Sequence, residues 1–305
     1  LEIIMLSQTP HLDVRPIYET FINEKKGTDR GFLALQRYTD DFINRKQWDS
    51  AIYYYSKFYN SFPERRYIFN KILDILKAPI ENLKLTNLGN LINSNSNEWD
   101  PNPSPDGRYL YFSANHRSGG FGGDDVWVSE FQNGTWLKPK NAGRPINGKN
   151  DETIDNITVD GNTLLLSGTF DGTFGKFDIF SIDKDSTGWS DLYHFPYPIN
   201  TTHTDESGYI TSDGKAIIFT SDRPGGIGPH IPFGWIYNGG ANGNMDIYVS
   251  IKSDTGWSKP INLGTTINTP FAERSAFLHP DGKTLYFSSD GHPGLGRLDV
   301  FKSVR

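Results

Sequence analysis

A fourfold repeat constrains this chain of 305 residues more than any other sequence feature. Each copy carries an Ile-Asn pair, an acidic residue, an Asp-Gly turn, an alternating strand and a further strand that opens on Asp. The Asp-Gly turns are Asp106-Gly107, Asp160-Gly161, Asp213-Gly214 and Asp281-Gly282, spaced by 54, 53 and 68 residues. Landmarks that stay in phase through four copies predict four similar β units.

The segments after each turn carry the strand signals. Apolar and polar residues alternate over 109–113, 163–167, 216–220 and 284–288, which predicts strands. A third strand opens on Asp125, Asp178, Asp246 and Asp299, and a Trp marks a fourth at Trp136, Trp189 and Trp257. This pattern predicts a mainly β protein, a β-propeller preceded by a small α-helical segment.

The fourth strand of the last unit has a candidate far upstream. Residues 82–89 read N-L-K-L-T-N-L-G and align with 135–143 and 256–264. We therefore expect 82–89 to close the last blade as its outermost strand, which removes exposed sheet edges. This count predicts four blades, and the alternative is a truncated ring of five or six.

Three regions follow: an N-terminal arm over 1–28, a helical segment over 29–78 and the propeller over 79–305. Leu35, Tyr38 and Phe42 share one face of a predicted helix, and Pro63 and Pro79 end two later ones. The helical segment resembles one tetratricopeptide repeat. Short helices bury little surface by themselves, so Trp48, Tyr55 and Phe58 should face the β domain or a partner.

Three segments of the β region, 104–114, 221–228 and 257–270, resemble the TolB-type, WD-like propeller repeats of Gram-negative envelope proteins. The order of segments is similar to that of propellers linked to OmpA-like domains and to type IX secretion, although this chain carries no OmpA-like domain. The resemblance implies a non-enzymatic scaffold that binds protein partners in a larger assembly. It also implies a place in the periplasm or at the cell surface, associated with the outer membrane but not spanning it.

Composition and motifs argue against several other functions. The net charge of −6 excludes a mainly nucleic-acid-binding role, which needs concentrated positive charge. The chain has no cysteine, and its seven histidines show no metal-binding spacing. We therefore expect no catalytic residues, no metal and no cofactor.

Two acidic sets repeat with the blades. The strand-opening Asp residues predict a structural role, in which each carboxylate accepts backbone N–H groups of the neighbouring loop. The second set should surround the mouth of the central channel: Glu98, Glu152, Glu206 and Glu273. These glutamates either cap backbone groups or bind a cation or amine.

The longest interruption of the repeat lies over 224–244 in the third unit, with about 15 extra residues. It contains His230, Phe233, Trp235 and Tyr237, and its face should also carry Arg117 and Arg223. Exposed aromatic residues on a long loop predict a surface that binds a protein partner. Alternatively, the loop folds back over the channel as a plug. The alternative function is a glycan-binding or carbohydrate-active propeller that uses the acidic ring and this insertion.

Overall fold

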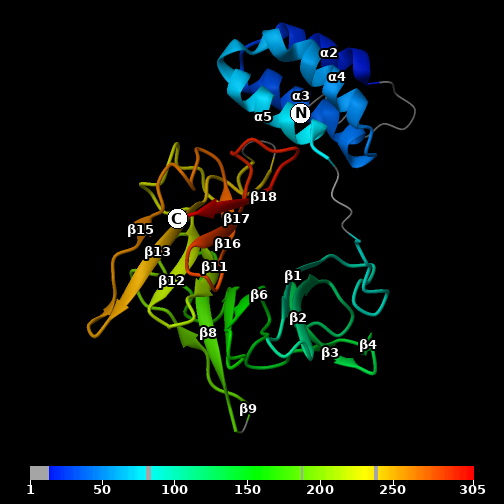
Figure 1. The fold of residues 1–305 in the computed structure, drawn as a ribbon. Coiled ribbons are helices and arrows are strands. Elements are labelled where there is room, and N and C mark those ends of the chain that lie inside the picture. Colours follow the sequence, from blue (N-terminus) through cyan, green and yellow to red (C-terminus); the bar gives the residue numbers. More distant parts are fainter. Residues whose placement is uncertain (1–13, 80–83, 187, 237–239) are drawn as a thin grey trace. The chain divides into compact units, whose positions relative to one another are not determined.

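The computed structural model describes residues 14–79, 84–186, 188–236 and 240–305. The chain is mainly β, and the described residues form four sheets arranged as a four-bladed propeller and four N-terminal α-helices (Figure 1). It divides into two compact units. One contains the helices and the loop Asp290–Asp299, and the other contains Lys84–Tyr237, Ala241–Ser289 and Val300–Arg305.

The described part of the helical unit contains four α-helices. Helices α3 (Asp29–Asn44), α4 (Trp48–Phe58) and α5 (Arg66–Lys77) match the expected ones, and two short 3-10 turns, Tyr59–Ser61 and Pro63–Arg65, join the last two. Helix α2 (Arg15–Glu24) lies within the predicted arm, and residues 1–13 lie outside the described residues. Thr28 caps α3 by accepting from the Gly31 N–H, as Thr does at many helix starts.

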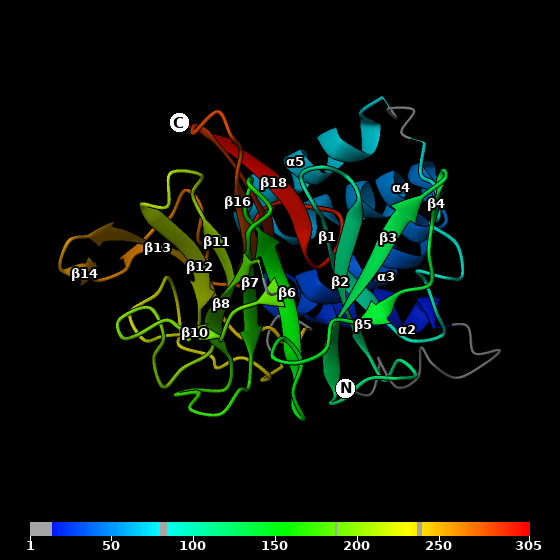
Figure 2. The same cartoon turned by 90° about the horizontal axis from the view of Figure 1, so that it is seen from below.

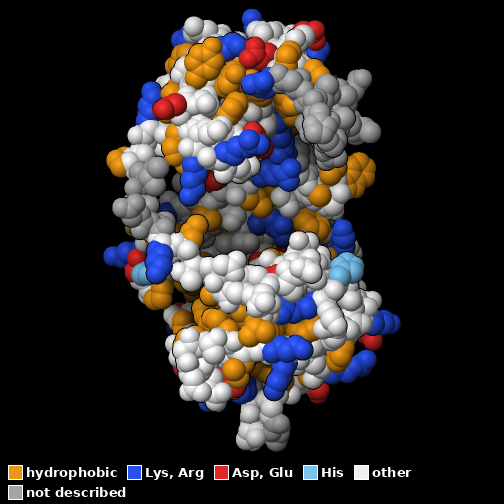
Figure 3. All heavy atoms as spheres, turned by 90° about the vertical axis from the view of Figure 1, so that its right-hand side faces the viewer, with side chains coloured by type: hydrophobic (Ala, Val, Ile, Leu, Met, Phe, Trp, Pro, Cys, Tyr) orange, Lys and Arg blue, Asp and Glu red, His pale blue; other side chains and the backbone are white. Residues whose placement is uncertain are grey.

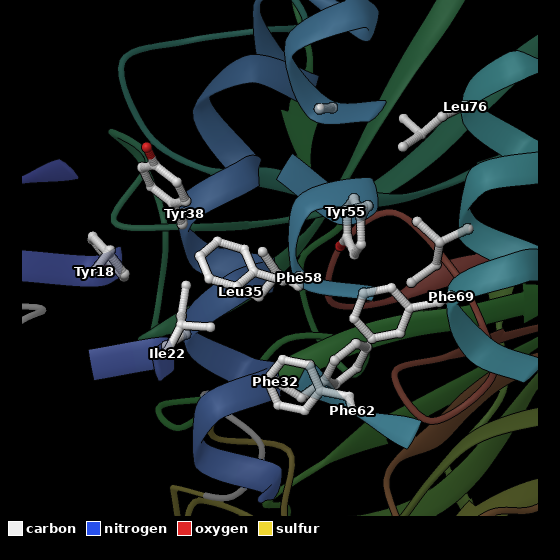
Figure 4. Close-up of a cluster of buried hydrophobic side chains, with 13 residues drawn as sticks. Tyr18, Ile22, Phe32, Leu35, Tyr38, Tyr55, Phe58, Phe62, Phe69 and Leu76 are labelled. Atoms are coloured by element: carbon white, nitrogen blue, oxygen red, sulfur yellow. The ribbon is translucent and has the colours of Figure 1, made fainter. Parts of the chain in front are cut away.

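The apolar faces of these helices form a core of their own (Figure 4). Tyr55, Phe62 and Phe69 are fully buried there, and the Phe62 and Phe69 rings stack with centroids 5.7 Å apart. Tyr55 and Phe58 therefore face this core, and Trp48 packs against its edge. For Tyr55 and Phe58, the expectation that they face the β domain or a partner is therefore wrong. Helix α2 contributes Tyr18 and Ile22 to the same core.

Each of the first three sheets contains a long three-strand meander and two short outer segments (Figure 2). Blade 1 consists of β1 (Glu98–Pro103), β2 (Tyr109–Asn115), β3 (Asp124–Gln132), β4 (Thr135–Trp136) and β5 (Lys140–Asn141). Blade 2 consists of β6 (Glu152–Ile157), β7 (Thr163–Gly168), β8 (Asp178–Asp185), β9 (Gly188–Trp189) and β10 (Tyr193–His194). Blade 3 consists of β11 (Asp205–Ile210), β12 (Ala216–Ser221), β13 (Asp246–Ser253), β14 (Gly256–Trp257) and β15 (Ile261–Asn262). Blade 4 consists of β16 (Glu273–Leu278), β17 (Thr284–Ser289) and β18 (Asp299–Val304).

The Asp-Gly turns join the first and second strands, as predicted. Their glycines adopt left-handed φ angles of +67° to +74°, which suit a residue without Cβ. The Asp side chain accepts a hydrogen bond from the backbone N–H two residues later. In blade 1, the Arg108 N–H donates to the Asp106 carboxylate at 3.0 Å. Repetition of this turn sets the register of all four first hairpins.

Apolar clusters join consecutive blades. Tyr111 and Val126 of blade 1 pack with Leu164 and Phe180 of blade 2, and similar clusters join blade 2 to blade 3 and blade 3 to blade 4. A further cluster, centred on Ile92 and Trp127, belongs to blade 1 alone. None of these clusters of described residues joins blade 4 to blade 1.

The structure corrects the predicted closing strand. Residues 84–89 form no strand, Leu85 is 91% exposed, and the fourth sheet has three strands among the described residues. Residues 82 and 83 lie outside the described residues. The sequence similarity of this segment to other fourth strands predicts pairing, but pairing also requires that the segment lie beside β18.

Two surface properties bear on function. In the described part of the chain, no helix has the length and apolar character needed to cross a membrane. Figure 3 shows one face of the molecule, on which Lys and Arg side chains are interspersed with hydrophobic and acidic ones.

Candidate functional site in the central channel

The inner strands of the four blades share one irregularity. Each of β1, β6, β11 and β16 shifts register against its neighbour near its middle, as at a β-bulge. At these shifts, Asp100, Ser207 and Ser275 adopt left-handed φ angles of 48°, 56° and 54°, uncommon for residues with a Cβ. Bulges of this kind redirect side chains and concentrate at functional sites.

The bulges surround a channel of about 260 Å³. Its lining combines carboxyl, amide and hydroxyl groups with the ring of Phe277 and comes from all four inner strands. The polar lining residues are Asp100, Asn102, Asp155, Asn156, Ser207 and Ser275. This volume lies slightly below the usual range of ligand pockets, about 300–1,000 Å³. The channel therefore suits a small polar ligand.

Two carboxyl groups in the channel have unusual environments. Asp155 accepts hydrogen bonds from the Ser167 hydroxyl at 2.6 Å and the Gly208 N–H at 2.8 Å. Enclosure by the strands nevertheless raises the pKa of Asp155 to about 8. Desolvation also raises the pKa of Asp100 to about 6, which Arg274 partly offsets. At neutral pH, Asp155 is therefore mainly protonated and Asp100 mainly ionised.

The Asp100 carboxylate differs from Asp155 in its contacts. Among the described residues, no donor forms a hydrogen bond with it. Asp100 is half-buried, so a ligand or solvent must complete the hydrogen bonding of its carboxylate. This residue is therefore the strongest candidate for ligand contact in the channel.

An ion pair lies close enough to influence both channel carboxyls. Arg274 of β16 pairs with Glu206 of β11, and its other terminal nitrogen donates to Asn242 at 3.1 Å. The Arg274 Nε is buried without a hydrogen-bond partner among the described residues. The Phe233 ring covers this guanidinium at 5.3 Å. Close to the channel, the Asp100 carboxylate can thus still accept a hydrogen bond and the Arg274 Nε can still donate one.

The repeated acidic residues of the first strands are Glu98, Glu152, Asp205 and Glu273, and each of them holds backbone groups. Glu98, Glu152 and Glu273 each accept the backbone N–H of the residue four positions earlier, at 3.0, 2.7 and 2.6 Å. The equivalent position in blade 3 is Asp205, which bonds Thr201 in the same way at 2.7 Å. Glu206 lies one residue further along and points to Arg274. These contacts match the capping interpretation, and the described residues contain no cluster of three or more His, Cys, Asp or Glu able to hold a metal.

Arg117 and Arg223 also hold the loops at the first strands. Arg223 donates to the Pro198 and Ile199 carbonyls at 2.9 and 2.6 Å and pairs with Asp205 at 2.6 Å. Arg117 makes the equivalent contacts with the Leu91 and Ile92 carbonyls and with Glu98. Each guanidinium lies over two aromatic rings, so neither is free to bind a partner.

The strand-opening Asp residues have the expected structural role. Asp125, Asp178, Asp246 and Asp299 each accept backbone N–H groups of the preceding loop, at 2.6 to 3.0 Å for the shortest bond of each. A Cβ at Gly120, Gly226 or Gly294 would lie within 2.5 Å of the carboxylate, so these loops require glycine there.

The third-blade insertion is divided between packed and exposed residues. Phe233 is half-buried, and Lys176 lies 5.0 Å from its ring centroid. Trp235 and Ile236 are 67% and 77% exposed, and His230 is exposed beside His203. Tyr237 lies outside the described residues. The plug interpretation thus fits Phe233, while Trp235 and Ile236 are available to a partner.

A second cleft lies between loops of blades 1 and 2. It measures about 510 Å³ and is lined by Arg144, Lys149, Glu152, Asp171 and His194 among others. Glu152 and His194 already have protein partners there, namely the Gly148 N–H and the Asp178 carboxylate. The central channel therefore remains the stronger candidate despite its smaller volume.

The sequence analysis missed the two channel carboxyls and Asp205. Asp205 had a usable signal, because it lies 8 residues before Asp213, the spacing that the other three copies keep. Asp100 and Asp155 follow the first-strand acid by two and three residues respectively. That offset carries no recognisable pattern, since each bulge interrupts the period of two.

The class of protein is set by these sheets: a four-bladed propeller with a polar central channel. No protein family and no curated protein matches the chain. Solved structures resemble it distantly. An α-L-arabinofuranosidase from Lactobacillus brevis shares 14% identity over 68% of this chain and 72% of that one, with a TM-score of 0.42.

Two further structures are similar at the same level. The Pseudomonas aeruginosa periplasmic gluconolactonase shares 12% identity over 67% of this chain and 56% of that one, with a TM-score of 0.35. Kuenenia stuttgartiensis hydrazine synthase shares 18% over 61% of this chain, with a TM-score of 0.36, and the chain spans 47% of its length. These similarities are too distant to assign a function.

Proposed function

We propose that this chain is a carbohydrate-binding propeller that holds a monosaccharide-sized ligand in its central channel. The observation that carries the proposal is Asp100, a strained residue whose carboxylate lines the channel without a protein donor. Sugar hydroxyls donate to carboxylates, and their C–H faces pack on aromatic rings such as Phe277. Asn102, Asn156 and Ser275 supply further groups that fix orientation.

Isothermal titration calorimetry with a panel of neutral and amino monosaccharides tests the proposal. We expect one sugar to bind with a stoichiometry of one, and Asp100→Asn to weaken its binding at least about tenfold because a charge-assisted hydrogen bond is lost. Asp171→Asn, in the second cleft, is the matched control and should bind normally. Binding lost in the control but kept in Asp100→Asn would move the site to the second cleft, and no binding by any sugar would refute the proposal.

The protonation states of the channel also permit chemistry. A protonated Asp155 and an ionised Asp100 line the same channel, and glycosidic cleavage uses one carboxyl group in each of these protonation states. Incubation with aryl glycosides of the sugar that binds separates the two forms of the proposal. Release of the aryl group that Asp155→Asn abolishes would make the chain carbohydrate-active, and its absence would leave a binding protein.

A second candidate function is an interaction scaffold in the cell envelope, associated with the outer membrane. The exposure of Trp235 and Ile236 on the third-blade insertion favours it, because large apolar side chains in solvent mark contact surfaces. Fractionation of the native cell, with detection of the chain by antibody, tests the proposed location. Recovery in the cytosolic fraction would contradict it.

We expect the double change Trp235→Ala and Ile236→Ala to weaken binding of a protein partner about thirtyfold, the effect of losing one hot-spot anchor of about 2 kcal/mol. The melting temperature should stay nearly constant because neither side chain is packed. Crosslinking in cells followed by mass spectrometry identifies the partner. Equal crosslinking of the variant and the unchanged chain would exclude this surface.

A further inference from the structure

A repeated side-chain contact joins each of the first three blades to the loop that follows it. The side-chain amide of Asn147 accepts the Val126 N–H and donates to the Val126 carbonyl, both at 2.8 Å. Asn200 bonds Ile179 in the same way at 2.8 Å, and Asn268 bonds Ile247 at 2.8 and 2.9 Å. The bonded backbone belongs to the residue just after each strand-opening Asp.

The geometry that presents this Asn is built locally. In blade 3, Asn262 Oδ1 accepts from the Gly264 N–H and from the Asn268 amide, at 2.8 and 2.9 Å. The Asn268 N–H then donates to the Gly264 carbonyl at 2.8 Å. Asn141, Gly143 and Asn147 repeat all three bonds at 2.8 to 2.9 Å. We call this arrangement the Asn clasp.

A further Asn clasp lies ahead of blade 1, over residues 87–93. Asn87 Oδ1 accepts from the Gly89 N–H and the Asn93 amide at 2.8 and 3.0 Å, and the Asn93 N–H donates to the Gly89 carbonyl at 2.9 Å. Ile92 is buried against blade 1, as the equivalent Ile146 is against blade 2. The clasp is therefore complete, but Asn93 is exposed and bonds no strand among the described residues.

The matching backbone is also present and uncovered. Val300 follows Asp299 as Val126 follows Asp125, yet Val300 is 75% exposed while Val126, Ile179 and Ile247 are fully buried. Exposed and half-buried side chains alternate along β18, and the exposed set runs from Val300 to Val304, which is 64% exposed. The outer edge of β18 pairs with no strand among the described residues (Figure 1).

We propose that the Asn clasp at 87–93 of one copy docks on the outer edge of β18 in a second copy of this chain. Asn93 would bond the Val300 backbone, and residues 84–88 would add a strand to blade 4, as β15 adds to β13 in blade 3. Within one copy, all four inner strands already line the channel while Val300 stays exposed. The clasp over 87–93 and the outer edge of β18 therefore fit each other between two copies of the chain.

Each copy carries one Asn clasp that bonds no strand among the described residues, over 87–93, and one receiving edge, on β18. The contact is therefore head-to-tail, and two copies can close by forming it twice. Sedimentation velocity over a dilution series should show concentration-dependent association. Asn93→Ala should weaken it about tenfold or more, because the two-way amide contact is lost, while Asn95→Ala in the same exposed segment should not. A chain that stays monomeric at every concentration overturns the proposal.

Cysteine trapping tests the register and distinguishes one copy from two. Blade 3 pairs Val249 with Ile261, and the equivalent positions are Lys302 and Thr86. Because the chain has no cysteine, Thr86→Cys and Lys302→Cys can be made singly, mixed and oxidised with glutathione disulfide. A disulfide-linked dimer that forms only in the mixture supports docking between copies. Overturning results are no crosslink in the mixture, or a double variant that crosslinks only within one chain.

Discussion

Asp155→Asn should stabilise the protein at high pH and leave it nearly unchanged at low pH. The folded state raises the pKa of Asp155 from 3.8 to about 8, chiefly by desolvation. A raised acid pKa contributes stability that is complete below pH 4 and is lost as the pH rises to about 8. Asparagine keeps the shape and can still accept from Ser167 and Gly208, but it never ionises.

The free energy of unfolding, measured by urea denaturation between pH 4.5 and 9, gives the size of this effect. We expect the difference between the variant and the unchanged protein to grow by an amount on the order of 4 kcal/mol across that range. Glu152, Glu273 and Asp100 also have raised pKa values. The free energy of unfolding of the variant should therefore still fall as the pH rises, but less steeply than that of the unchanged protein. Asp254→Asn, at an exposed turn, is the matched control. Equal slopes in the two variants would show that Asp155 is not enclosed.

The second large effect concerns the ion pair that holds the third blade. Arg223→Ala should lower the free energy of unfolding by about 3 kcal/mol, because it leaves Asp205 buried without its cation. The change also removes two bonds to the carbonyls of Pro198 and Ile199 and the contacts with the Phe219 and Tyr248 rings. Burial already raises the pKa of Asp205, and Arg223 is the main group that opposes it.

Two companion variants make this result specific. Arg108→Ala removes an exposed pair with Glu130 and should cost less than about 1 kcal/mol. Adding Asp205→Asn to Arg223→Ala should recover about 1 kcal/mol or more, since the uncompensated charge disappears with it. If Arg223→Ala costs no more than Arg108→Ala, the pair does not hold the blade.

The sequence predicted the regular parts of the fold because these parts depend on local chemistry. The four Asp-Gly turns require a left-handed glycine, and the alternating segments after them became β2, β7, β12 and β17 within one or two residues. The strand-opening Asp residues were predictable in the same way, since one carboxylate and one glycine-rich loop recur in every blade.

The irregular parts could not be predicted from a period. Asp100 and Asp155 lie at bulges, where the alternation of faces fails and no pattern marks which side chain enters the channel. Asp205 and Glu206 are adjacent, yet the Asp205 side chain bonds Thr201 while the Glu206 side chain pairs with Arg274. The strand expected over 82–89 shows a further limit. The sequence pattern of this segment predicts a strand partner, but residues 84–89 pair with no strand in the structure of one copy.

The most direct test of a carbohydrate-binding channel is a crystal structure of the chain with the monosaccharide that binds best in calorimetry. We expect the sugar between the four inner strands, with a hydroxyl within hydrogen-bond distance of the Asp100 carboxylate and a ring face on Phe277. An empty channel, with the sugar instead in the cleft beside Asp171 or on Trp235, would contradict the proposed function.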